Sequence, residues 1–252
     1  MDKLPTKKTT GDVVREVGRA VASLVPAAGG PLQVVFENFF ASPLERRKEA
    51  WLQKLAEVLE EVQGRVSDLT PEKLAANEAF VTVAMQASQI ALRNHQQAKL
   101  DALRNAVLNA ALPNSPQEDE QMIFLRLIDQ LTPWHLRVLS VLDSPARWME
   151  RNGVANPGWG AGGVSTVLEH CLPDLRGQRD TYDQIVRELQ SEGLLGQGQF
   201  LHITMTGGGM LESRTTERGK RFMRFITAPG PCPKADLTGH IWTPPKAQET
   251  DR

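Results

Sequence analysis

The clearest pattern of apolar and polar positions lies between residues 181 and 227. Apolar residues recur at helical spacing from Ile185 to Leu189, and the run ends at Gly193, where a helix C-terminal glycine is expected. Two alternating runs follow, one on each side of the glycines at 207–209, and a last helix is expected from about Thr216. The order helix, glycine, hairpin and helix predicts a winged-helix unit, with the glycines at the tip of the hairpin.

Helical spacing of apolar residues also dominates the chain upstream. Residues 42–64 carry one apolar stripe, opened by Pro43 at the first helical position. Residues 71–112 contain no helix breaker, although the polar residues 94–97 interrupt the stripe, so one kinked helix and two helices both fit.

Shorter amphipathic helices are expected over 117–131, 133–144 and 164–175, with a third helix of the winged unit over 181–192. The segment 145–163 is rich in Gly, Pro and Trp and is expected to form a short helix and then a loop. This connection is longer than most in compact domains and is a candidate functional loop.

The predicted fold class is mainly α, a helical bundle followed by a winged-helix domain. Four segments are expected: a flexible N-terminus (1–10), a helical domain (11–115), a winged-helix-like domain (116–227) and a proline-rich tail (228–252).

Residues 20–36 contain no charged side chain, but prolines and glycines break the stretch in its middle. Two interpretations remain open: two short helices that pack on a soluble core, or a hairpin that enters a bilayer. In either case the candidate residues for contact with a membrane or a partner are Leu24, Val25, Leu32, Val35, Phe36, Phe39 and Phe40.

Charge argues against a dedicated nucleic-acid protein. The 252 residues have a net charge of −1, and residues 131–227 are nearly neutral. The third helix of the winged unit mixes bases with acids, and the glycine tip carries no base. If the unit does bind DNA, the expected contacts are Arg179, Arg187, Arg214, Arg218, Lys220 and Arg221. A protein interaction, with a partner or by self-association, or a purely structural role of the unit is therefore preferred to DNA binding.

The residues that carry chemistry form no known constellation. The two cysteines, Cys171 and Cys232, have neither metal nor disulfide spacing, the five histidines are scattered, and Walker and GxSxG motifs are absent. We therefore expect no catalytic residue, no metal and no cofactor. Cysteine usage and the lack of a secretory signal indicate a cytoplasmic protein.

Three stretches resemble a known family. They are LRNAVLNAALPNSPQEDEQMIFLRLIDQLTPWHLRVL (103–139), IVRELQSEGLL (185–195) and TTERGKRFMRFI (215–226). Their arrangement is similar to that of the abortive-infection alpha family of bacterial phage-defence proteins, over roughly half of the chain. The resemblance implies a bacterial defence protein in the cytoplasm or at the membrane, and it transfers no catalytic residue.

Three hypotheses of function follow. The first is a non-enzymatic, abortive-infection-like defence protein that acts by protein–protein contacts, with a membrane-directed N-terminal segment as an open option. The alternative is a winged-helix DNA-binding transcriptional regulator. The third is an enzyme that uses the loop around Trp159.

Overall fold

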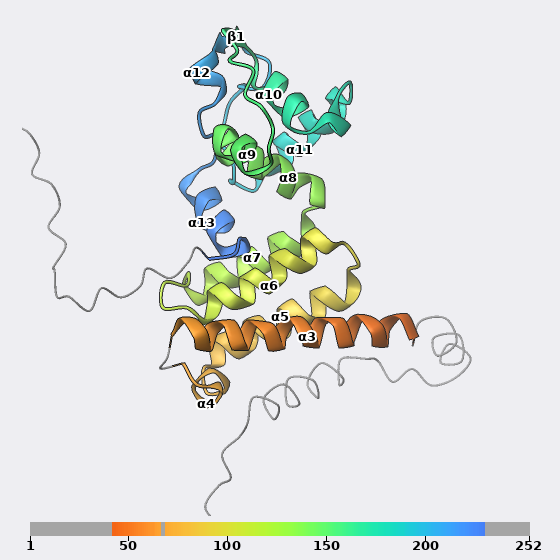
Figure 1. Ribbon diagram of the computed structural model, residues 1–252, viewed down its shortest axis with the longest axis vertical. Coiled ribbons are helices and arrows are strands. Elements are labelled where there is room, and N and C mark those ends of the chain that lie inside the picture. Colours follow the sequence, from red (N-terminus) through yellow and green to blue (C-terminus); the bar gives the residue numbers. More distant parts are fainter. Residues whose placement is uncertain (1–41, 67–68, 230–252) are drawn as a thin grey trace, which may run out of the picture.

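The computed structural model describes residues 42–66 and 69–229. This part of the chain is mainly helical, with one small antiparallel sheet of two strands. The helices are stacked along the long axis of the molecule, with α3 at one end and the sheet with α12 at the other (Figure 1). The segment 20–36 and the seven apolar residues from Leu24 to Phe40 lie outside the described residues.

The first part of the described chain, up to residue 111, forms four helices: α3 (Ser42–Arg65), α4 (Pro71–Ala75), α5 (Glu78–Arg93) and α6 (Gln97–Ala111). The stretch 71–112 is thus three helices, and its break at 94–96 is one of the two expected alternatives. The break before α5 was not expected from the pattern. It arises because the Asn77 side chain accepts a hydrogen bond from the backbone N–H of Phe80 (3.1 Å), which caps a new helix.

The second half contains the helices expected there and further elements that were not expected. In order they are α7 (Glu118–Gln130), α8 (Pro133–Asp143), α9 (Pro145–Arg151), β1 (Ala161–Gly162), α10 (Val164–Cys171), the 3₁₀ helix η2 (Pro173–Leu175), α11 (Arg179–Ser191), β2 (Met205–Thr206), α12 (Gly207–Met210) and α13 (Glu217–Ile226). The helix expected over 164–175 is divided at Pro173, because proline lacks the N–H that an α-helix needs. The short helix expected after residue 145 is confirmed as α9.

The hairpin expected around the glycines 207–209 is wrong. Met205 and Thr206 pair with Gly162 and Ala161, which lie more than forty residues earlier in the sequence. The three glycines belong to the short helix α12. Thr206 caps that helix by accepting a hydrogen bond from the Gly209 N–H (3.2 Å). Glycine is needed at 207 for another reason, since a Cβ there would collide with the Trp159 carbonyl.

Gly193 ends α11 as predicted. Its φ of 69° lies in the left-handed region, which glycine adopts at little cost. The Leu194 N–H then donates to the Leu189 carbonyl (2.9 Å), which closes the helix end. The buried Leu194 and Leu195 turn the chain back into the core.

Helix α13 joins the two halves of the molecule. It packs against both α6 and α8, and Phe222 and Phe225 meet Phe124 of α7 at ring-centroid distances of 5.4 and 5.6 Å. One buried apolar cluster runs from Trp51 to Ile226 through both halves. The position expected for a domain boundary, near residue 116, lies before α7, and α7 packs on α5 and α6.

Two α6 asparagines cap the C-terminal end of α13. The Asn109 amide lies within hydrogen-bond distance of three carbonyl oxygens, those of Arg224 (3.1 Å), Phe225 (2.9 Å) and Thr227 (2.9 Å). Asn105 donates to the carbonyl of Ile226 (3.1 Å). These carbonyls have no partner inside their own helix, so α6 supplies what the end of α13 lacks.

Helices α6 and α7 are also joined through Lys99, which is 6% exposed. Its ammonium donates to the backbone carbonyl of Asp129 near the end of α7 (2.7 Å), where the helix dipole favours a cation. Burial lowers the pKa of Lys99, and the Asp129 carboxylate counteracts part of that shift. Within the described residues, no helix is both long and apolar enough to cross a bilayer.

Candidate functional site

A groove runs between α11 and the segment 198–203. Its volume is about 450 Å³, and its lining residues are Arg179, Asp183, Val186, Arg187, Gln190, Gly198, Gln199, Phe200, Leu201, His202 and Ile203. The sequence pattern placed α11 in the position of a recognition helix, so this groove contains the surface on which any partner of that helix would lie.

The segment 198–203 is fixed against its surroundings by hydrogen bonds. The Gln190 amide of α11 donates to the carbonyls of Gly196 and Gly198, both at 2.9 Å. The Ser165 N–H at the start of α10 donates to the Leu201 carbonyl (2.9 Å). Because the segment is held at Gly198 by α11 and at Leu201 by α10, its backbone is positioned without a partner.

The groove has an apolar floor and an exposed apolar rim. Val186 and Leu201 are buried beneath it, and Phe200 is half-buried. Ile203 is 54% exposed. Two large hydrophobic residues are exposed in the described part of the chain, and Ile203 is the more exposed of them. The groove thus combines a buried apolar floor with one exposed apolar side chain at its edge.

The polar rim carries a basic excess. His202 Nε2 lies 2.8 Å from Asp183 Oδ1, and Arg179 Nε lies 3.6 Å from the other carboxylate oxygen, so this single acid is already paired. The Arg187 guanidinium donates to the neutral Gln184 amide (2.8 Å) and has no ion-pair partner among the described residues. An approaching carboxylate would therefore find Arg187 available.

Glu188 is the next residue after Arg187, but its carboxylate contacts His135 of α8. It accepts hydrogen bonds from Gln184 and pairs with His135 Nε2 of α8 (2.7 Å), and these two contacts, the Gln184 bond first, hold the pKa of its carboxyl below the usual range. Glu188 thus ties α11 to α8 and is not a free acid of the groove.

The His135 contact completes a hydroxyl–imidazole–carboxylate series that the sequence did not disclose. Thr132 Oγ1 lies 2.8 Å from His135 Nδ1, opposite the bond to Glu188. The Thr132 backbone N–H also donates to Nδ1 (3.3 Å), so this nitrogen accepts hydrogen bonds at the start of α8. The geometry is a capping box with histidine in the place of glutamate, and we assign it to holding α8 and α11 together.

Arg214, a second candidate for DNA contact, has a structural position. Its guanidinium donates to the Gly209 carbonyl and to Met205 Sδ (3.1 Å), and it lies over the Phe200 ring at 5.7 Å. Its backbone N–H donates to the Leu142 carbonyl of α8 (2.9 Å). With a side chain only 19% exposed, Arg214 holds the segment before α13 against the body.

The remaining predicted cations lie on α13, outside the groove lining. Lys220 pairs with Glu217 (2.8 Å), and Arg221 pairs with Glu120 at the start of α7 (2.7 Å). Arg218 is half-buried near Gly193. The structure thus brings Arg179 and Arg187 into one groove and leaves the other four predicted cations outside it. The groove could not be predicted from the sequence, because Ile203 belongs to an alternating run that was expected to form a strand.

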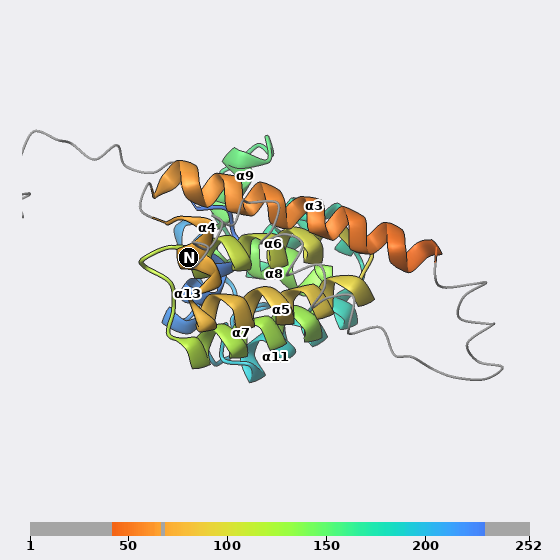
Figure 2. The same ribbon diagram turned by 90° about the horizontal axis from the view of Figure 1, so that it is seen from below.

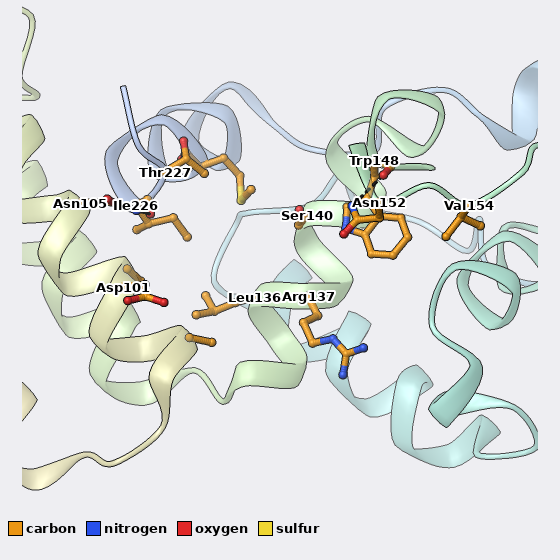
Figure 3. A pocket seen from close by; sticks show the side chains of 13 residues that line it. Asp101, Asn105, Leu136, Arg137, Ser140, Trp148, Asn152, Val154, Ile226 and Thr227 are labelled. Atoms are coloured by element: carbon orange, nitrogen blue, oxygen red, sulfur yellow. Dashed lines mark hydrogen bonds between the residues drawn. The ribbon is translucent and has the colours of Figure 1, made fainter. Parts of the chain in front are cut away.

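A second groove lies between α6, α8, α9 and α13 and has a volume of about 530 Å³. Figure 3 shows Asp101 facing Leu136 and Arg137 across it, with Trp148 and Asn152 beyond. Asp101 accepts hydrogen bonds from Lys54 (3.2 Å) and Gln97 (2.6 Å), and Asn152 donates to the Trp148 carbonyl (2.7 Å). Its polar groups are thus largely engaged within the protein.

The described residues include no group of three or more His, Cys, Asp or Glu side chains placed to hold a metal ion. Cys171 is buried, and burial raises the pKa of its thiol to about 11, so it is a poor nucleophile near neutral pH.

The chain matches no known family model, no curated protein and no solved structure.

Proposed function

We propose that this chain is a non-enzymatic, abortive-infection-like defence protein of the bacterial cytoplasm, which acts by binding protein through the groove between α11 and residues 198–203. The observation that carries the proposal is Ile203, 54% exposed at the edge of a preformed groove with an apolar floor. The defence role rests on the family resemblance of residues 103–139, 185–195 and 215–226.

The C-terminal half is proposed to be a winged-helix unit with a modified wing. The elements α8, β1, α10 and α11 support this, although α9 and η2 lie between them. The antiparallel bridge between Leu195 and Thr215 also supports it, because it encloses residues 196–214, with β2 and α12, as the connection that follows the third helix. In this unit the groove lies between the third helix and the wing.

Charge supports a protein partner over DNA. Residues 133–227 contain eleven Lys and Arg against ten Asp and Glu. Of the six cations considered for DNA, Lys220 and Arg221 form ion pairs and Arg214 is mostly buried. A DNA-reading surface needs several cations free to meet phosphates, since phosphate contacts supply most of the affinity.

The test is protection of a bacterial host against phage. Cells that produce the wild-type chain should give fewer plaques than cells with an empty vector, and Ile203→Glu should lose that protection because a charge enters the apolar edge of the groove. Gln89→Glu is the matched control, because it places the same side chain on the exposed face of α5. Protection that survives Ile203→Glu would exclude the groove as the acting surface.

DNA binding is the second candidate, favoured by one observation: Arg179 and Arg187 are both exposed on α11. If the chain is a regulator, a gel-shift assay on the promoter beside its gene should show binding that weakens steeply with salt. The double variant Arg179→Ala, Arg187→Ala should then lose the shift. Binding that this variant retains would rule out α11 as the reader.

The membrane option for residues 11–40 is tested separately. The full chain should float with liposomes, and a chain lacking these residues should not. Equal flotation of both proteins would remove the membrane from the proposal.

A further inference from the structure

Two large hydrophobic residues are exposed in the described part of the chain, Ile123 (37%) and Ile203 (54%). They lie on different elements, and both have charged neighbours, which for Ile123 include the exposed Arg126 of the same helix. Ile203 lies at the groove whose rim carries Arg179 and Arg187. Ile123 lies on α7, whose first turn holds Glu118, Asp119 and Glu120.

The acids near Ile123 differ in what they contact. Glu120 pairs with Arg221 of α13 (2.7 Å). Glu118 and Asp119 are exposed and form no ion pair with the described residues. Asp119 and Ile123 are four positions apart, so they project from the same face of the helix. The N-terminal part of α7 therefore presents an apolar residue beside a free carboxylate.

We propose that the partner of the groove is a second copy of this chain, bound through the Asp119–Ile123 face of its α7. This inference rests on the proposed function, since it names the protein that the groove accepts. The apolar Ile123 enters beside Phe200 and Ile203. The Asp119 carboxylate meets the guanidinium of Arg187, whose hydrogen-bond acceptor among the described residues is the neutral Gln184 amide.

The arrangement of the elements favours a closed pair over an open chain of copies. Helices α7 and α11 lie along the same side of the molecule, at the lower edge of Figure 2. A two-fold axis beside that edge allows α7 of each copy to face the groove of the other, so that both contacts form at once. The expected assembly is a symmetric dimer with two identical contacts between unlike surfaces.

The apolar contact supplies most of the affinity, and the charges orient it. Exposed ion pairs contribute little by themselves, whereas an isoleucine that leaves water contributes through its buried area. Removing either isoleucine should therefore weaken the dimer more than removing either charge.

Sedimentation velocity of the full chain over a range of concentrations tests the inference. The wild type should show a monomer–dimer equilibrium. Ile203→Glu and Ile123→Glu should each weaken dimerisation at least tenfold, and Gln89→Glu should leave it unchanged. A wild type that stays monomeric at all concentrations would overturn the inference.

Mixing the two variants separates this interface from simpler ones. In each variant alone both contacts are damaged, but a mixed pair has one intact contact, between α7 of the Ile203→Glu chain and the groove of the Ile123→Glu chain. The mixture should therefore form more dimer than either variant alone. A groove-to-groove dimer would leave Ile123→Glu fully dimeric and show no gain on mixing, which would contradict the inference.

Charge exchange gives a second test. Arg187→Glu and Asp119→Arg should each weaken the dimer, and the chain that carries both changes should recover part of the loss because the pair is restored with reversed signs. Additive losses in the double variant would be evidence against the Asp119–Arg187 contact.

The outcomes also separate this inference from the proposed function. If Ile203→Glu abolishes phage protection while the wild type is monomeric, the groove binds another protein and only the identity of the partner is wrong. If the dimer forms as described but Ile203→Glu leaves protection unchanged, the self-association stands and the proposed function fails.

Discussion

Helices α11 and α13 use similar side chains in opposite ways. On α13, Lys220 and Arg221 pair with carboxylates of the same molecule, and the end of the helix is capped by Asn109 of α6. On α11, the Arg187 guanidinium donates to the neutral Gln184 amide, forms no ion pair within residues 42–66 and 69–229, and borders an open groove. The difference teaches that a cation on a helix indicates a binding surface only when it has no ion-pair partner inside the molecule.

The largest effect should come from the packed face of α13. Phe222→Ala removes a fully buried ring that lies edge-on to Phe124, and it should lower the free energy of unfolding by about 3–5 kcal/mol. Ile203→Ala on the open groove should change it by less than about 0.5 kcal/mol. Chemical denaturation of both variants measures the contrast, and similar losses would break the distinction between a packed and an open surface.

A smaller but still large loss is expected from Gly207→Ala. The new Cβ would collide with the Trp159 carbonyl, so the contact between α12 and the loop before β1 must move apart. We expect a destabilisation of about 2 kcal/mol, in the range of overpacked sites. Gly208→Ala is the matched control, because a Cβ at 208 meets no atom within 4 Å. Thermal unfolding should separate the two, and equal melting temperatures would show that the close approach is not required.

The capping of α13 from α6 gives the next effect. Asn109→Ala leaves the last carbonyls of α13 without this donor, which should cost about 1–3 kcal/mol. Hydrogen exchange should rise most at the α13 amides. If exchange rises equally throughout the molecule, the amide is not a local cap.

The smallest effect concerns the inner side of α11 and is spectroscopic. Tyr182, the only tyrosine, is buried, and burial together with its hydrogen bond to Glu169 (3.1 Å) raises its pKa to about 12. A pKa above the unfolded value of about 10 means that this stabilisation is complete below pH 10 and is lost as the pH rises towards 12. Absorbance at 295 nm should show a midpoint near 12 in the folded protein and near 10 in denaturant. A folded midpoint near 10 would place Tyr182 in water, on the open side of the helix.

The sequence predicted most helices because their ends depend on neighbouring residues. Pro133, Gly193 and Thr216 mark boundaries through local geometry, and the structure confirms all three. The break at Asn77 was not predicted, because in the sequence Asn77 looks like any other polar residue of a long helical pattern, and its capping bond is visible only in the structure.

Contacts between distant residues could not be predicted in this way. The glycines at 207–209 suggested a hairpin, but the partner of β2 is β1, and the alternating pattern does not say which strand pairs with which. Likewise Arg214 was a candidate cation for DNA contact, whereas its side chain donates to Gly209 of α12 and its backbone N–H donates to the distant Leu142 carbonyl of α8. The groove depends on the same long-range folding, so only Arg179 and Arg187 were found in advance.

The asparagine amides that cap α13 also limit the order in which the parts of the molecule can fold. Asn109 and the carbonyl of Phe225 are 116 positions apart, so this end of the helix has its donor only after nearly the whole described chain exists. Contacts of such sequence separation form late, because a long loop must close before they give any stabilisation. During synthesis α3 to α6 can assemble first and then serve as the template on which the last helix is finished.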